Sequence, residues 1–173
     1  MSRIFMIADT HFGHPNVIKY EKRPFRDVEE MDSTLVKNWN SVVKSRDKVF
    51  LLGDFSFYNK EKSSEICKAL NGHKTLIMGN HDDKSPNYYM DCGFDCVSKY
   101  PVIFEEYWIL SHEPKYINDS MPYANIFGHV HANKQYRDYS ASGFCVSVER
   151  IDYTPIDFER IKQAVMEENN NET

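Results

Sequence analysis

The chain has 173 residues, 41% of them hydrophobic, and its formal net charge is −5 because 26 acidic side chains outnumber 21 basic ones. This length suits one domain with a full core. The lack of a basic excess argues against a protein whose main task is to grip long nucleic acid, because such binding depends on neutralising phosphates. The first apolar run, Ile4–Ala8, is too short for a signal peptide, and no later run could span a bilayer. We therefore expect a soluble, cytoplasmic protein without membrane contacts.

The four cysteines are expected to be reduced. Cys92 and Cys96 are four positions apart, which is not the C-x-x-C spacing of a redox or zinc site. A chain of this size without an export signal can fold without disulfides. We therefore predict structural thiols at Cys67, Cys92, Cys96 and Cys145.

Apolar strands alternate with amphipathic helices in the first half of the chain. Strands are predicted at Arg3–Ala8, Asp47–Leu52 and His73–Met78. Helices are predicted at about Val28–Ser45, after the capping residue Asp27, and at Lys60–Leu70, before the helix-ending pair Asn71-Gly72. Pro15–Phe25 is expected to form an ordered loop with a helical turn. The alternation predicts a parallel sheet with right-handed crossovers.

The second half has short strands with little room for helices between them. After a short helix at Pro86–Asp91, strands are predicted at Phe94–Ser98, Val102–Glu105, Tyr107–Ser111, Ala124–Phe127 and Phe144–Val148. The first three are expected to be antiparallel, with Glu105-Glu106 near a tight turn. Thr154 as a cap and Pro155 in the first helical position predict a final helix to about Glu167. We expect a single domain over residues 1–168 and a disordered tail over residues 169–173.

Side chains of metal-binding type follow the apolar strands at five places. These are Asp9-Thr10-His11, Gly53-Asp54, Gly79-Asn80-His81-Asp82, His112 and Gly128-His129-Val130-His131. Five of the seven histidines fall in these short stretches, too many for chance placement. Open α/β sheets bind ligands beyond the carboxyl ends of their strands, so these side chains are expected to meet at one edge. Oxygen donors and imidazoles without a thiolate suit Mn²⁺, Fe, Zn²⁺, Ni²⁺ or Co²⁺, and they are too many for one tetrahedral ion.

In this order, the five stretches resemble the calcineurin-like metallophosphoesterase superfamily over residues 4–131. The opening from Asp9 through Phe25 further resembles a small stand-alone subgroup of bacterial and phage phosphoesterases. The resemblance implies a four-layer α/β/β/α sandwich, with two mixed β-sheets face to face between outer helices. It also implies two divalent metal ions, with Mn²⁺ as the first candidate. It assigns Asp9, His11 and His131 to the first ion, Asn80, His112 and His129 to the second, and Asp54 to both.

The same resemblance gives His81 and Asp82 catalytic roles. His81 would protonate the leaving oxygen of a phosphoester, and Asp82 would orient or polarise its imidazole. A hydroxide bridging the two ions would attack phosphorus. His14 and Arg23 are candidates for contacting the substrate phosphate, Arg23 through its forked guanidinium. The alternatives are a loop histidine satisfied by backbone groups and a solvated charge.

Other conspicuous side chains are interpreted as structural. His73 precedes a strand and would lie at the wrong end of the sheet for the metal site. A set of aromatic residues is expected to pack in the core and against the sheets rather than to form a platform for nucleobases. The set comprises Tyr88, Tyr89, Tyr100, Tyr107 and Trp108.

These residues predict a phosphoester hydrolase. Diesters are favoured because a proton from His81 helps most when the leaving group is a poor alkoxide. The expected substrate is a small phosphoester, nucleotides included, and stable nucleic-acid binding is not expected. Three alternatives stay open: a phosphomonoesterase or nucleotide pyrophosphatase on the same metals, a nuclease on DNA or RNA, and a non-catalytic metal-binding scaffold. A homo-oligomer is compatible with the sequence.

Overall fold

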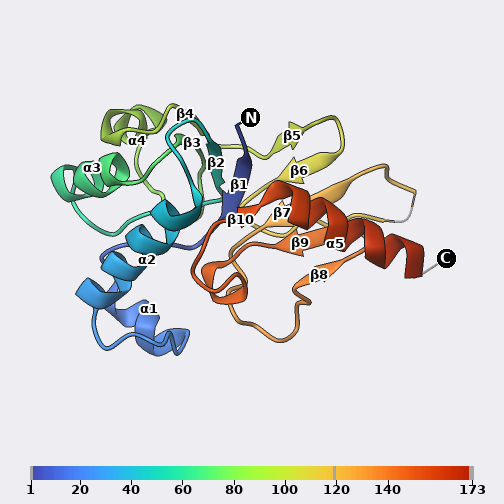
Figure 1. The fold of residues 1–173 in the computed structure, drawn as a ribbon, viewed down its shortest axis with the longest axis horizontal. Helices are drawn as coiled ribbons and strands as arrows, with labels where there is room; N and C mark the ends of the chain where they lie inside the picture. Colours follow the sequence, from blue (N-terminus) through green and yellow to red (C-terminus); the bar gives the residue numbers. More distant parts are fainter. Residues whose placement is uncertain (1, 119, 172–173) are drawn as a thin grey trace.

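The computed structural model describes residues 2–118 and 120–171, which form two five-stranded sheets (Figure 1). The first sheet has the order β10-β1-β2-β3-β4, with strands Ile156–Asp157, Ile4–Ile7, Lys48–Leu51, His73–Ile77 and Cys96–Ser98. The second has the order β5-β6-β7-β9-β8, with strands Val102–Phe104, Trp108–Leu110, Ala124–Phe127, Gly143–Cys145 and Tyr139–Ser140. Both sheets are mixed, because β10, β5 and β8 each run antiparallel to their neighbour while the inner strands are parallel.

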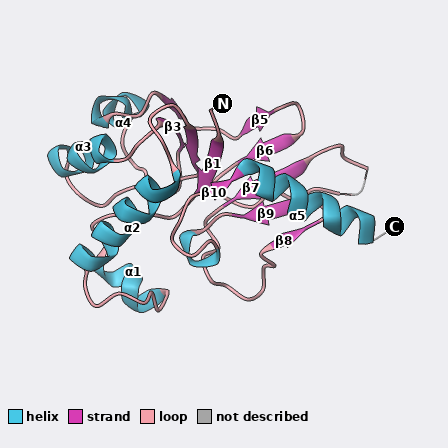
Figure 2. Ribbon diagram, in the orientation of Figure 1, coloured by secondary structure: helices cyan, strands magenta, loops and turns pink. Residues whose placement is uncertain are grey.

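The described residues form five α-helices. They are α1 (Pro15–Tyr20), α2 (Val28–Val42), α3 (Lys60–Ala69), α4 (Pro86–Cys92) and α5 (Phe158–Asn171). Figure 2 shows α2, α3 and α4 gathered beside the first sheet, and α5 lying along the second. Contacts of α5 reach β8 and β9 as well as β1 and β10. This is the four-layer α/β/β/α sandwich that the sequence predicted.

Local sequence signals explain where the helices of the first half begin. Asp27 caps α2 by accepting a hydrogen bond from Glu30 N at 2.9 Å, and Asn59 caps α3 in the same way. Such a cap contributes about 1 kcal/mol, and packing of the apolar face supplies the rest of a helix's stability. In α2 that face includes Met31 and Trp39, both fully buried. The helical turn expected between the first strand and α2 is α1.

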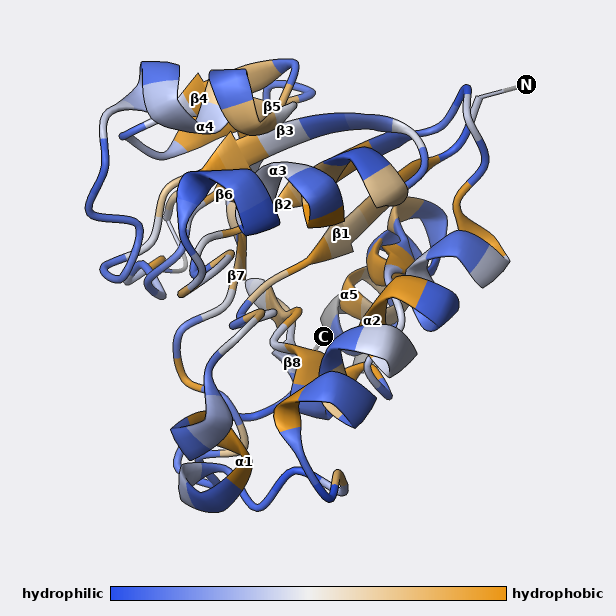
Figure 3. Ribbon diagram, turned by 90° about the vertical axis from the view of Figure 1, so that its left-hand side faces the viewer, coloured by the Kyte–Doolittle hydropathy of each residue, from blue (hydrophilic) through white to orange (hydrophobic). Residues whose placement is uncertain are grey.

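Ala8 joins the two sheets at the carboxyl end of β1. Its backbone N–H donates to Val146 O at 2.9 Å, and Val148 N donates to Ala8 O at 3.2 Å. One cluster of buried apolar side chains therefore runs through both sheets, from Phe5 to Trp108. In Figure 3, β1 and β2 are mainly hydrophobic, while α2 and α3 alternate between hydrophilic and hydrophobic residues. The core thus holds the ends of strands from both sheets close together.

The pairing of β4 differs from the sequence prediction. Phe94–Ser98 was expected to be antiparallel to the following strand, but β4 runs parallel to β3 and closes the first sheet. The prediction was wrong because α4 provides a crossover, which is what a parallel pair requires. The hairpin of β5 and β6 is confirmed, and both Glu105 and Glu106 at its turn have positive φ.

The chain after Thr154 also differs from the prediction. Instead of opening a helix, Ile156–Asp157 forms β10, which pairs antiparallel with β1. The free edge of β1 offers backbone partners, and pairing with them outweighs the local capping signal. The helix α5 begins at Phe158, where Asp157 accepts a hydrogen bond from Glu159 N at 3.0 Å. It continues to Asn171, so residues 169–171 are helical rather than part of a tail, and residues 172–173 lie outside the described residues.

The expectations for the cysteines and for four of the five selected aromatic residues are confirmed. All four cysteines are free thiols. Four of the five selected aromatic residues pack into or against the core, but Tyr100 is 75% exposed. Among the described residues, no helix has the length and apolarity needed to cross a bilayer.

Candidate metal centre

Side chains from five loops meet where the two sheets adjoin. Asp9, Asp54 and Asn80 follow β1, β2 and β3, His112 follows β6, and His129 and His131 follow β7. The Asp54 Oδ2 atom lies 3.5 Å from the Nε2 atoms of both His11 and His112. A carboxylate in this position can be shared by two ions. All seven ligands predicted from the sequence therefore lie in one region, at the carboxyl ends of the strands.

The ligands form two groups on either side of Asp54. In the first group, His11 Nε2 lies 3.3 Å from His131 Nε2, and both can share an ion with Asp9. In the second, Asn80 Oδ1 lies 2.9 Å from His112 Nε2 and 3.0 Å from His129 Nδ1. Asp9 is also close to His112, at 3.8 Å from Oδ1 to Nδ1. The grouping agrees with the sequence prediction, and the roles of these residues as ligands stay a prediction.

Hydrogen bonds to the outer ring nitrogens suit the site for divalent metal ions. The Nδ1 of His112 lies 2.8 Å from the carbonyl oxygen of Leu52, which can only accept, so this nitrogen carries the proton. The Nδ1 of His131 lies 3.0 Å from the Glu149 carboxylate. The Nε2 atom of His112 is thereby left with a lone pair for a metal ion, and that of His131 can offer one once a cation displaces its proton, as in known metal sites. Oxygen and imidazole donors in this number fit two divalent ions.

The pKa values of the first group are also those expected of side chains that share a metal ion. Burial raises the pKa of the Asp9 carboxyl to about 6 and holds the pKa of His11 well below its usual range. Burial lowers the pKa of His131 as well, but its hydrogen bond to Glu149 and the nearby Asp9 charge outweigh this effect and raise it to about 9. Buried carboxylates and imidazoles at such close range are stabilised by a shared cation, to which they bind in their deprotonated forms.

The backbone at the ligands is strained. Positive φ angles, which L-residues rarely adopt, occur at Asp9, His11, Asp54, His129 and His131, between 47° and 69°. Each such residue costs free energy that the surrounding fold must supply, and this kind of strain gathers at functional sites. The glycines of the motifs are needed for close approach. A Cβ atom at Gly79 would lie 2.7 Å from Asp54 N, and one at Gly128 would lie 2.7 Å from Asp9 Oδ2.

His81 lies at the mouth of the site. Its backbone N–H donates to Asp54 Oδ1 at 3.0 Å, and its side chain is exposed. The His81 ring centroid is 5.6 Å from the ring of His11 and 5.2 Å from the ring of Phe57. The imidazole can therefore reach a ligand bound at the metal centre without being part of it.

Asp82 has a different role from the one predicted. Its Oδ2 accepts hydrogen bonds from Asp54 N at 2.7 Å and Gly79 N at 2.8 Å, and its Oδ1 accepts one from Phe55 N at 3.1 Å. The carboxylate is 3% exposed and fully used by these backbone donors. It therefore positions the loops after β2 and β3 and does not polarise His81.

Arg23 is likewise not directed at a substrate. Its side chain is completely buried and pairs with Glu149 Oε1 at 2.7–2.8 Å. The guanidinium also donates to the carbonyl oxygens of Asp9 at 2.7 Å and Thr10 at 3.1 Å. All three of its nitrogens are engaged, so the expected contact with phosphate has no donor to make it. Arg23 instead supports the first ligand loop.

Two residues beside the metal centre were missed by the sequence analysis. Glu149 links His131 to Arg23, but a glutamate after an apolar strand gives no local signal of that role. Phe57 stacks on His14 with ring centroids 4.0 Å apart and is 44% exposed at the mouth of the site. The His14 ring centroid also lies 5.6 Å from that of His11, and the contact of His14 with a substrate phosphate stays a prediction. His73 lies far from it in the first sheet, exposed at the amino end of β3 beside Asp95.

Comparison with known proteins identifies the family of the chain. The profile of the calcineurin-like phosphoesterase family matches residues 2–169. The chain belongs to this family. As a calcineurin-like phosphoesterase it is a hydrolase of phosphoric esters that uses divalent metal ions.

Relatives of this calcineurin-like phosphoesterase occur in archaea, bacteria and phages. It is 38% identical to protein MJ1445 of Methanocaldococcus jannaschii over 95% of this chain and 92% of that one. The Gene 66 protein of Mycobacterium phage L5 is 37% identical over 50% of this chain and 42% of that protein. The crystal structure of Aquifex aeolicus AQ665 superimposes with a TM-score of 0.75 and 28% identity, over 95% of this chain and all of that one. Pseudomonas putida nuclease MPE shares the fold, with a TM-score of 0.52 and 23% identity over 75% of this chain and 61% of that one.

Proposed function

We propose that the chain is a dinuclear metal-dependent phosphodiesterase that acts on small phosphoesters. The observation that carries the proposal is the position of the Asp54 Oδ2 atom, 3.5 Å from an imidazole nitrogen of each ligand group. Asp9, His11 and His131 would hold one ion and Asn80, His112 and His129 the other, with Mn²⁺ as the first candidate metal. When bound, two such ions would acidify a shared water to a pKa of about 7 and draw charge from the phosphoryl oxygens.

The protein's own residues supply the other requirements of the reaction. His81 lies at the mouth of the site, outside both ligand groups, and would donate a proton to the leaving oxygen. General acid catalysis of this kind contributes about 10²–10⁴-fold. It matters most for an alkoxide leaving group, and this favours diesters over activated monoesters. The strained loops would hold the ligands in place and limit reorganisation during the reaction.

The proposal is tested with metal-stripped protein to which Mn²⁺, Ni²⁺, Zn²⁺, Co²⁺ or Mg²⁺ is returned. We expect metal-dependent hydrolysis of bis-p-nitrophenyl phosphate in preference to p-nitrophenyl phosphate. The variant His81→Ala should keep both ions yet lose about 10²–10⁴-fold in kcat on an alkyl diester. The matched control is His73→Ala, because His73 is exposed at the far end of β3.

Other results would point to other functions. Preference for the monoester would indicate a phosphatase on the same site. Two bound ions without turnover on any ester would indicate a metal-binding scaffold. Loss of metal from the His81→Ala protein would show that His81 is a ligand rather than the acid.

A further inference from the structure

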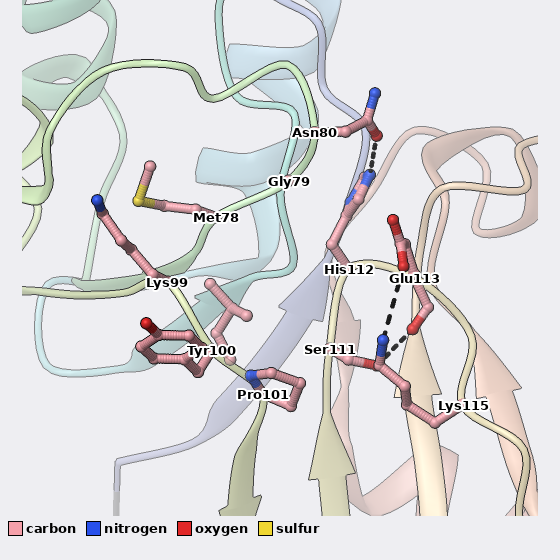
Figure 4. Close-up of a pocket in the computed structure, with 11 residues that line it drawn as sticks. Met78, Gly79, Asn80, Lys99, Tyr100, Pro101, Ser111, His112, Glu113 and Lys115 are labelled. Atoms are coloured by element: carbon pink, nitrogen blue, oxygen red, sulfur yellow. Dashed lines mark hydrogen bonds and ion pairs between the residues drawn. The ribbon is translucent and has the colours of Figure 1, made fainter.

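A hollow of about 250 Å³ opens beside the second ligand group. Asn80 and His112 form one end of it, as Figure 4 shows. Whatever fills the hollow must therefore lie next to the phosphate that reacts. Pockets for complete small ligands measure about 300–1,000 Å³. The hollow is thus suited to one part of a larger substrate.

One wall of the hollow comes from the end of β3 and the link between β4 and β5. It presents Met78, Lys99 and Tyr100 (Figure 4). The Tyr100 side chain is exposed, yet its backbone is fixed by the Ser98 hydroxyl, which donates to Tyr100 O at 2.8 Å and accepts from Tyr100 N at 3.2 Å. A phenol ring held at the surface beside a reactive centre is a surface on which a planar ring can stack.

The opposite wall is the loop after β6, from Ser111 to Lys115. Buried Asn125 fixes this loop, because its Oδ1 accepts from Lys115 N at 2.7 Å and its Nδ2 donates to Ser111 Oγ at 2.9 Å. The Lys115 ammonium is 3.6 Å from the Glu113 carboxylate. Within the described residues, Lys99 makes no ion pair. Two lysines and one glutamate thus line the hollow, and this excess of positive charge favours an anionic ligand.

The position of His81 decides which part of the substrate enters the hollow. His81 lies near His11 and Phe57, whereas the hollow adjoins Asn80 and His112. The leaving group must be near the acid, so the group retained on phosphorus points toward the hollow.

We propose that this hollow binds the retained nucleotide unit of a phosphodiester. Tyr100 would stack on the base, and Lys99 and Lys115 would pair with the neighbouring phosphate. A nucleotide is the substrate unit that combines a planar ring with a phosphate. This inference rests on the proposed phosphodiesterase activity and names the substrate class of that site.

The test uses three esters that share the p-nitrophenolate leaving group and differ only in the retained group. They are methyl p-nitrophenyl phosphate, thymidine 5′-(p-nitrophenyl phosphate) and the same thymidine ester with a 3′-phosphate. We expect kcat/KM to rise about tenfold from methyl to thymidine, since base stacking on an aromatic side chain has this order of effect. The 3′-phosphate should add about two- to fivefold, as an exposed ion pair does.

Two variants separate the contributions. Tyr100→Ala should bring the thymidine-to-methyl ratio close to one, and Lys99→Ala should reduce the gain from the 3′-phosphate. Tyr139→Ala and Lys48→Ala are controls, because both residues are exposed and lie outside the hollow. Calorimetry provides a readout without turnover: thymidine 3′,5′-bisphosphate should bind the metal-free Tyr100→Ala protein about tenfold more weakly than the wild type.

The outcomes distinguish the subsite from the activity on which it rests. If the wild type hydrolyses the methyl ester but gains nothing from thymidine, the subsite is wrong and the phosphodiesterase stands. If Tyr100→Ala keeps the full preference for thymidine, the base binds elsewhere and the inference is also overturned. If no diester is hydrolysed with any metal, the proposed function fails, and the subsite fails with it.

Discussion

The two ligand groups of the metal centre are supported in different ways. In the first group, His131 is backed by the Glu149 carboxylate, which is held in turn by the buried guanidinium of Arg23. In the second group, His112 is backed by the neutral carbonyl of Leu52. The groups also differ in exposure: Asp9 and His11 are buried, whereas Asn80 and His129 face solvent.

This difference predicts unequal metal binding. A carboxylate behind an imidazole raises its basicity as a ligand more than a carbonyl does. Burial keeps competing water away from the first group. The first position is therefore expected to bind its ion tightly. The second position is expected to exchange its ion more readily and to lie next to the substrate.

The largest effect is expected at the residue that the two groups share. Asp54→Asn should abolish binding at both positions together, because the Asp54 carboxylate lies between them. The loss should exceed the roughly 10–100-fold that follows removal of a supporting residue. Metal content after dialysis, together with bis-p-nitrophenyl phosphate hydrolysis, measures it. Retention of one full ion would show that Asp54 belongs to a single position.

A smaller and one-sided effect is expected from Glu149→Gln. It should weaken the first position about 10–100-fold and leave the second within about threefold. Calorimetric titration with Mn²⁺ resolves the two positions. The control is Glu65→Gln, since among the residues that the structure describes Glu65 pairs only with Lys62, on the surface of α3. Equal weakening of both positions would contradict the division into two separately supported groups.

Asp82→Asn should act mainly on the stability of the fold, because Asp82 holds the loop backbones of Asp54 and Gly79. We expect a decrease of about 2–3 kcal/mol in the free energy of unfolding, the order of a hydrogen bond to a charged group. Urea denaturation measures it. The pH profile of kcat should keep its shape in this variant. A shifted profile with normal stability would instead support a direct partnership with His81.

The smallest effect concerns the unmodified protein. A chelator added in steps should remove the ion of the second position first, with an affinity difference of about tenfold. Activity should fall with this first ion, and spectroscopy of Co²⁺-loaded protein can follow both steps. Simultaneous loss of both ions would mean that the two supports are equivalent.

The sequence was most informative about features that depend on residues close together in the chain. Asp9, Asp54 and His112 could be recognised because each closely follows a short apolar strand, and the side-chain pattern reveals strands directly. Helix α2 could be placed because Asp27 and one apolar face mark its start and its orientation. The failures at β4 and β10 concern pairing with strands distant in sequence, and local preference does not encode such pairing.

The sequence by itself thus determined the family and the kinds and order of the candidate ligands. The tertiary structure alone decided what supports them. Arg23 and Glu149 are 126 positions apart in the chain, so only folding brings this pair to His131. Folding also buries the Asp82 side chain and leaves Tyr100 at the surface. The physical reason is that burial and long-range hydrogen bonds depend on the packing of the two sheets against each other, whereas a motif reports only on its neighbours along the chain.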